Sequence, residues 1–166
     1  LVGSEMCIRD KDIGLENIAP NEGTLCGEID SEVLSIRSAK TVFSKNDVLY
    51  GKLRPYLNKV YFADFDGICS TDIIVLRFDT SESAKVFSYY MRRKEFVDIA
   101  MESKSGQQLP RTSWEKIKTI LVPQYDEANI NSLMSAIRLF EQKRDTITSS
   151  INELLSMQEN VIHKHL

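Results

Sequence analysis

Apolar residues in the first half of the chain come in short runs separated by turn residues, a pattern typical of β-strands. Strands are predicted at 47–53, at 59–63 and, after a turn at 64–67, at 68–78. The last of these contains the most apolar run, Ile73–Leu76. Short strands joined by tight turns favour an antiparallel meander with a buried centre.

Beyond residue 80 the apolar period changes to that of a helix. We predict one helix from about residue 81 to about residue 105, on the spacing of Val86, Phe87, Tyr90, Met91 and Val97. A loop at 106–111 is expected next, and then a short helical turn in which Trp114 packs into the core. A last strand is predicted at 117–122, because Pro123 ends it.

The segment 126–166 contains neither glycine nor proline and has apolar residues at spacings of three and four. A continuous helix of this size would be about 60 Å long at 1.5 Å per residue. Its heptad pattern is interrupted by Arg144 and Gln158 in one of the two core rows. Seven residues are predicted to face a partner helix: Leu133, Ile137, Phe140, Ile147, Ile151, Leu154 and Val161. The alternative is a helix that packs wholly on its own domain.

The predicted organisation is therefore a globular domain at 12–125 followed by a helix at 126–166. Residues 1–11 are expected to be a non-native or disordered leader, because they show no periodicity. The predicted fold class is α+β: a mixed, largely antiparallel β domain followed by a long C-terminal helix that forms a coiled coil.

The net charge of −3 argues weakly against nucleic-acid binding, but the charge is unevenly distributed. Residues 40–61 carry five basic side chains and one acidic, and residues 85–118 carry eight basic and four acidic. If these two blocks fold onto one face, the local field could attract phosphate despite the net charge. The alternative is an ordinary solvated surface.

No catalytic constellation is expected. The three cysteines are widely spaced, and no phosphate-binding, nucleophile-elbow or zinc-protease motif occurs. The two histidines, His163 and His165, are two residues apart on the predicted helix and so point to different faces. We therefore predict no catalytic residue, no metal and no bound cofactor. With no apolar run long enough for a membrane span and no signal peptide, we expect a cytoplasmic protein.

Four stretches in order resemble the specificity subunit of type I restriction–modification systems. They are KNDVLYGKLRPYLNK at 45–59, Ser70–Asp72 leading into Ile73–Leu76, the Gly106 loop running to Ile120–Pro123, and the helix after Glu127. The family usually has Glu-Gln where Glu127-Ala128 stands. The resemblance covers about residues 12–166.

This resemblance implies a target recognition domain that binds double-stranded DNA, followed by a conserved spacer helix. A complete subunit carries two such units, so this chain would be a fragment or a half-subunit that dimerises through its helix. It would read one half of a bipartite site and dock the DNA methyltransferase (modification) subunit, with a restriction subunit as a further partner. S-adenosylmethionine and ATP would be bound by those partners, and this chain would not itself be an enzyme.

The same resemblance singles out side chains for DNA contact. Gln107, Gln108 and Arg111 are the candidates for reading bases, since amide and guanidinium groups pair with adenine and guanine edges. The phosphate-contact candidates are Lys52, Arg54, Asn58, Lys59 and Lys104. Two other functions stay open: a helix-mediated adaptor or scaffold without a DNA role, and the recognition domain of a fused restriction–methylation enzyme.

Overall fold

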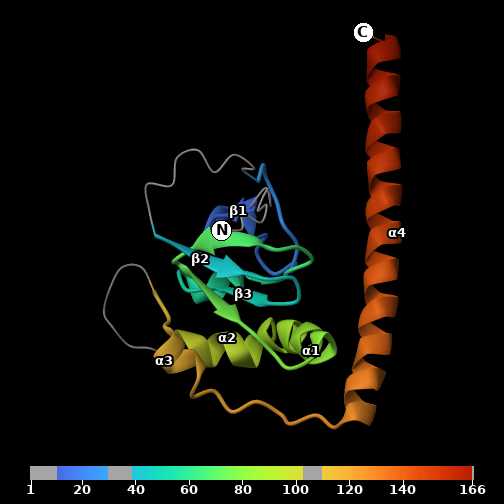
Figure 1. Ribbon diagram of the computed structural model, residues 1–166. Coiled ribbons are helices and arrows are strands. Elements are labelled where there is room, and N and C mark those ends of the chain that lie inside the picture. Colours follow the sequence, from blue (N-terminus) through green and yellow to red (C-terminus); the bar gives the residue numbers. More distant parts are fainter. Residues whose placement is uncertain (1–10, 30–38, 103–109, 166) are drawn as a thin grey trace, which may run out of the picture. The chain divides into compact units, whose positions relative to one another are not determined.

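The computed structural model describes residues 11–29, 39–102 and 110–165. The chain divides into two compact units, Leu1–Gln124 and Tyr125–Leu166. The first unit holds the strands and the short helices, and the second is a single helix (Figure 1). The predicted α+β class, with largely antiparallel sheets followed by a long helix, is confirmed. Of the expected leader at 1–11, only Lys11 is described, and it begins the first strand.

Six strands form two three-stranded sheets in the first unit. The strands are β1 (Lys11–Ile13), β2 (Lys40–Phe43), β3 (Val48–Gly51), β4 (Val60–Phe62), β5 (Gly67–Ser70) and β6 (Ile73–Leu76). One sheet has the order β4-β3-β6 and is antiparallel throughout. The other has the order β1-β5-β2, in which β1 runs parallel to β5 and β2 runs antiparallel to it.

The sheet β4-β3-β6 is buried on both faces, which explains why its central strand lacks a clear polar alternation. Val48 and Tyr50 belong to a core cluster that includes residues of the helices, and Leu49 belongs to a second cluster with Phe43 and Cys69 of the other sheet. Figure 1 shows the helices α1 and α2 on one side of β3 and the strands β1 and β2 on the other. The unit therefore has three layers, with β3 at its centre.

The strand predicted at 68–78 is two strands. The chain turns at Thr71–Asp72, where the Asp72 N–H donates to Ser70 Oγ at 3.2 Å. This turn carries the chain from the outer sheet into the central one. The hydrophobic pattern did not reveal the turn, because the residues on both sides of it are apolar and buried.

Three helices and two 3-10 turns complete the unit. They are η1 (Leu15–Asn17), η2 (Pro55–Leu57), α1 (Ser81–Met91), α2 (Lys94–Met101) and α3 (Trp114–Ile117). Thr80 caps α1, since its side chain accepts the Ser83 N–H. The single helix predicted from about 81 to 105 is broken after Arg92, whose guanidinium donates to the Glu22 carbonyl at 2.6 Å. This tertiary contact at the helix end could not be inferred from helical periodicity.

The prediction of a strand at 117–122 is wrong, because this segment is the end of a helix followed by irregular structure. Ile117 ends α3 and Ile120 follows in a turn, and both side chains are buried at a helical spacing of three. Leu121 is 93% exposed, and Trp114, expected in the core, is 50% exposed. The apolar run at 117–122 was read as a buried strand, but only two of its side chains reach the core.

The helix α4 spans Glu127–His165 and forms the second unit. Asp126 precedes it and accepts the Asn129 N–H at 2.7 Å, which satisfies one donor of the first turn. Nine large apolar side chains of this helix are exposed: Leu139, Phe140, Ile147, Ile151, Leu154, Leu155, Met157, Val161 and Ile162. None of the helices in the described ranges is both long and apolar enough to cross a membrane.

Asp47 joins the turn between the two sheets to the end of β6. Its buried carboxylate accepts the Ser44 N–H at 2.8 Å and a two-pronged contact from Arg77, at 2.9 Å from Nε and 2.7 Å from Nη2. Burial alone raises the pKa of this carboxyl group. The hydrogen bonds from Arg77 and Ser44 and the charge of Arg77 outweigh burial, so the pKa lies below that of an ordinary aspartate.

We expect Asp47→Ala to lower the free energy of unfolding by about 2 kcal/mol at neutral pH, because hydrogen bonds to a charged acceptor are lost. Since the folded-state pKa is lowered, the stabilisation is complete above the unfolded pKa of about 3.9 and is lost as the pH falls through the folded value. Urea unfolding at several pH values should therefore show wild type and variant converging below about pH 4. The exposed Asp79→Ala is the control, and a gap that stays constant with pH would contradict this account.

Candidate nucleic-acid interface

Lys52 follows β3 and is held on the neighbouring turn of the chain. β3 pairs with β6 so that Gly51 lies opposite Ile73. One more backbone hydrogen bond follows beyond the strand ends, in which the Lys52 N–H donates to the Asp72 carbonyl at 2.8 Å. The Lys52 ammonium donates to the Thr71 carbonyl at 2.5 Å. The side chain is half-buried, so its stem packs against the protein while its charge stays at the surface.

The segment 110–112 runs beside the residues that follow β3. Leu53 and Arg111 form an antiparallel bridge, and two bonds flank it: Thr112 N–H to the Lys52 carbonyl at 2.9 Å and Arg54 N–H to the Pro110 carbonyl at 2.8 Å. Thr112 is buried and anchors the segment. This pairing brings together Lys52 and Arg111, which are 59 residues apart in the sequence.

We call Lys52, Arg54 and Arg111 the basic cluster. Arg54 is exposed and has a left-handed backbone (φ 50°), which any residue other than glycine adopts at a cost. Arg111 is 53% exposed, and its Nη2 donates to Asp72 Oδ1 at 2.8 Å. The backbone pairing of 52–54 with 110–112 brings these three residues together, and their contact with DNA stays a prediction.

Tyr56 is a residue of this region that the sequence analysis missed. It lies in η2, directly after Arg54 and Pro55, and is 49% exposed. An aromatic side chain presented on a rigid turn beside basic groups is a suitable contact for a sugar or a base. The signal in the sequence was an aromatic residue after Arg-Pro, in a turn too tight to bury it.

Asn58 does not fit a phosphate contact, and this prediction is wrong. Its side chain is buried, and Nδ2 donates to the Arg92 carbonyl at 2.8 Å and to Asn21 Oδ1 at 3.2 Å. Asn58 has a left-handed backbone (φ 52°), which asparagine tolerates better than most residues. Its role is to close the turn after η2. Lys59 is half-buried, and its ammonium donates to the Leu15 carbonyl at 2.8 Å.

The remaining predicted residues have different outcomes. Gln107, Gln108 and Lys104 lie outside the described residues, so their part in DNA contact stays a prediction. Of the predicted helix interface, five side chains are exposed, Leu133 is partly buried and Ile137 is buried. The exposed five are Phe140, Ile147, Ile151, Leu154 and Val161.

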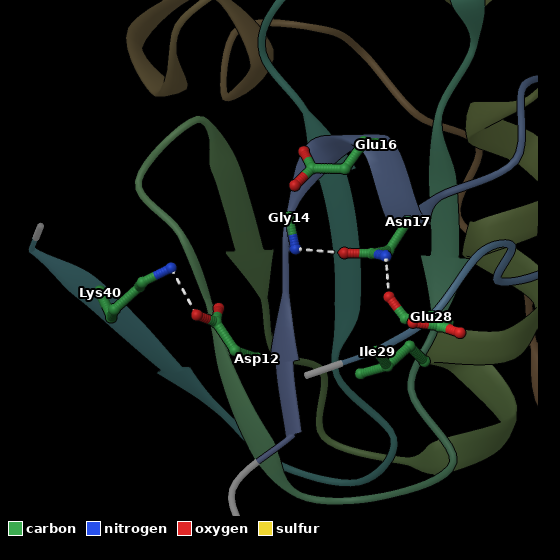
Figure 2. Close-up of a pocket in the computed structure, with 7 residues that line it drawn as sticks. All are labelled: Asp12, Gly14, Glu16, Asn17, Glu28, Ile29 and Lys40. Carbon is green, nitrogen blue, oxygen red and sulfur yellow. Dashed lines mark hydrogen bonds and ion pairs between the residues drawn. The ribbon is translucent and has the colours of Figure 1, made fainter. Parts of the chain in front are cut away.

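A cavity of about 420 Å³ lies elsewhere in the first unit (Figure 2). Asn17 spans one side of it: Oδ1 accepts the Gly14 N–H at 2.8 Å and Nδ2 donates to the Glu28 carbonyl at 2.9 Å. Lys40 pairs with Asp12 at 2.6 Å. The lining residues are Asp12, Gly14, Glu16, Asn17, Glu28, Ile29 and Lys40.

Three acidic residues and one basic residue line this cavity, so its charge disfavours a phosphate group. Within the part of the chain that the structure describes, no group of three or more His, Cys, Asp or Glu side chains could hold a metal ion. The basic cluster is therefore the better candidate site, and its chemistry is that of a cationic surface with several hydrogen-bond donors.

Asn58→Ala is expected to lower the free energy of unfolding by about 2 kcal/mol, because the Arg92 carbonyl loses a buried donor and alanine resists the left-handed backbone. Asn58→Gly should cost less, since glycine adopts this backbone freely. Chemical denaturation of the two variants separates the backbone effect from the hydrogen-bond effect. Equal stability of Asn58→Ala and wild type would refute the assigned role.

Comparison with known proteins places this geometry in context. No protein-family model matches the chain. The EcoDI specificity subunit of a type I restriction enzyme from Escherichia coli is 28% identical over 130 residues, which are 76% of this chain and 28% of that protein. This chain thus spans less than a third of that relative's length.

Two solved structures share the fold. One is the HsdS subunit from Thermoanaerobacter tengcongensis, with a TM-score of 0.62 and 21% identity over 82% of this chain and 37% of that one. The other is a chain from a study of complex assembly and conformational transition of the type I R-M system, with a TM-score of 0.66, 20% identity and the same coverage. The resemblance predicted from the four sequence motifs is confirmed: this chain is related in sequence and in fold to one part of a type I restriction enzyme specificity subunit.

Proposed function

We propose that this chain is a DNA-recognition module of a type I restriction–modification system. The observation that carries the proposal is the basic cluster. Lys52 and Arg54 lie in one segment and Arg111 in another, and backbone hydrogen bonds hold the two segments side by side. The relationship to a specificity subunit supports the same reading. The module supplies position, and its partners supply the chemistry.

In this proposal Lys52 and Arg54 contact the phosphate backbone, and Arg111, Gln107 and Gln108 read base edges. Lys52 and Arg54 neutralise phosphates, which gives affinity without sequence preference. Arg111 pairs with a guanine edge in the major groove, and Gln107 and Gln108 pair with adenine. Gln107 and Gln108 precede Arg111 by four and three residues in the sequence, so we assign all three to base reading.

The helix α4 gives the module its partners. A helix with an exposed apolar row over several heptads is stable in water only when a second helix covers that row. We propose that it pairs either with the second half of a complete subunit or with a second copy of this chain. A two-fold pair of recognition modules would read a bipartite palindromic site.

The same assembly would dock a modification subunit. That subunit would flip the target adenine out of the duplex and methylate it with S-adenosylmethionine, and an ATP-dependent restriction subunit would join the complex. This chain then needs no cofactor of its own. An adaptor without a DNA role would also pair through α4, but it would not need the basic cluster. A measurement of DNA binding therefore discriminates between the adaptor and the recognition module.

Replacing Lys52 and Arg54 together by alanine should weaken duplex binding about equally for all sequences. It should also reduce the slope of log affinity against log salt by about 2, one for each phosphate contact. The measurement is a fluorescence anisotropy titration at several salt concentrations. Lys45→Ala, at the other end of β3, is the matched control and should change the slope less. Unchanged binding in the double variant, or no duplex binding by wild type, speaks for the adaptor.

Introducing charge into the apolar row should abolish pairing of α4. Ile147→Glu combined with Leu154→Glu places two carboxylates where a partner helix must pack, and each buried charge is costly. Ser149→Glu combined with Ser156→Glu adds the same charge on the opposite helix face. Sedimentation analysis should show loss of association for the first pair only. Equal behaviour of the two pairs would count against this interface.

A further inference from the structure

An acidic side chain, Asp72, lies within the basic cluster. Its carboxylate accepts a hydrogen bond from Arg111 Nη2 at 2.8 Å, and its carbonyl accepts the Lys52 N–H at 2.8 Å. The carboxylate is 33% exposed and the Arg111 side chain 53% exposed. A negative charge at a surface that binds phosphate reduces affinity, so its presence needs a reason.

Stability does not supply that reason. Ion pairs between side chains this exposed contribute little to folding, because solvent screens them and ordering two long side chains costs entropy. The backbone of this region is held without the pair, by the Leu53–Arg111 bridge and the buried Thr112. The ion pair with Asp72 restrains the guanidinium group of Arg111.

We propose that Asp72 is a positioning residue that orients Arg111 for reading a base, an inference that rests on the proposed function. A guanidinium group recognises guanine through two donors in one plane, so the plane must be set before contact. A carboxylate fixed at Nη2 sets that plane. It also lowers the attraction of Arg111 for any phosphate, which favours the specific contact over the non-specific one.

Both partners of the pair are anchored on rigid backbone. Asp72 sits in the turn between β5 and β6, with its N–H donating to Ser70 Oγ at 3.2 Å and its carbonyl bound to Lys52. Arg111 is bridged to Leu53, directly after Lys52. One stretch of backbone, 52–53, therefore holds the backbones of both Asp72 and Arg111, and the register of β3 with β6 places Asp72 beside Lys52.

The test is selection of bound duplexes from a random library by the full chain, followed by sequencing. Wild type is compared with Asp72→Ala, Asp72→Asn and Arg111→Ala, and with Asp79→Ala as the control. Asp79→Ala removes the same charge at the other end of β6. Arg111→Ala should lose about tenfold preference at one base position. Asp72→Ala should lose preference at that same position while binding non-specific duplex at least as tightly as wild type.

Asp72→Asn keeps an oxygen acceptor for Arg111 and should retain part of the base preference. Asp72→Ala should still bind non-specific duplex, which excludes misfolding as the reason for its lost preference. Asp79→Ala should leave all preferences unchanged. If Asp72→Ala strengthens binding to every duplex and keeps the wild-type preference, Asp72 masks Arg111 and does not position it, and the inference is wrong. If wild type selects no sequence at all, the proposed function fails, and this inference fails with it.

Discussion

The register of β3 between β4 and β6 is the constraint on which the rest of the structure depends. All four residues of this strand are buried, and its two faces serve two different core clusters. A slip of one residue would exchange Leu49 with its neighbours and put the wrong side chain into each cluster. Because Gly51 must lie opposite Ile73, Lys52 must lie beside Asp72, and the segment 110–112 can then pair with 52–54.

This arrangement shows how an acidic protein can carry a cationic site. The chain has a net charge of −3, and acidic residues line the cavity at Asp12, Glu16 and Glu28. Basic side chains are gathered at the end of the central strand, where the outer and central sheets meet in the turn at Thr71–Asp72. Separation of charge over the surface sets the local field, and the local field decides where a phosphate backbone is attracted.

The two units differ in how far they bury their own apolar side chains. Most of the large apolar side chains that the structure describes in the first unit are buried in two clusters; the exposed ones are Val42, Tyr56, Trp114, Leu121 and Val122. The helix α4 leaves a row of large apolar side chains exposed along most of its length. The proposed function assigns different tasks to the two units: the first would contact DNA, and the helix would pair with a second helix.

By itself the sequence determined the α+β class and the long helix with its apolar row, because periodicity is a local property. The resemblance of its motifs to a known family supplied the candidates Lys52, Arg54 and Arg111. Only the tertiary structure decided that the run at 68–78 turns at Asp72, that the helix after residue 80 breaks at Arg92, and that Asn58 is buried. Each of these features is accompanied by a contact across the chain: Asp72 with Lys52, Arg92 with Glu22, and Asn58 with Arg92. The free energy of such contacts comes from partners distant in sequence, so no pattern of neighbouring residues contains it.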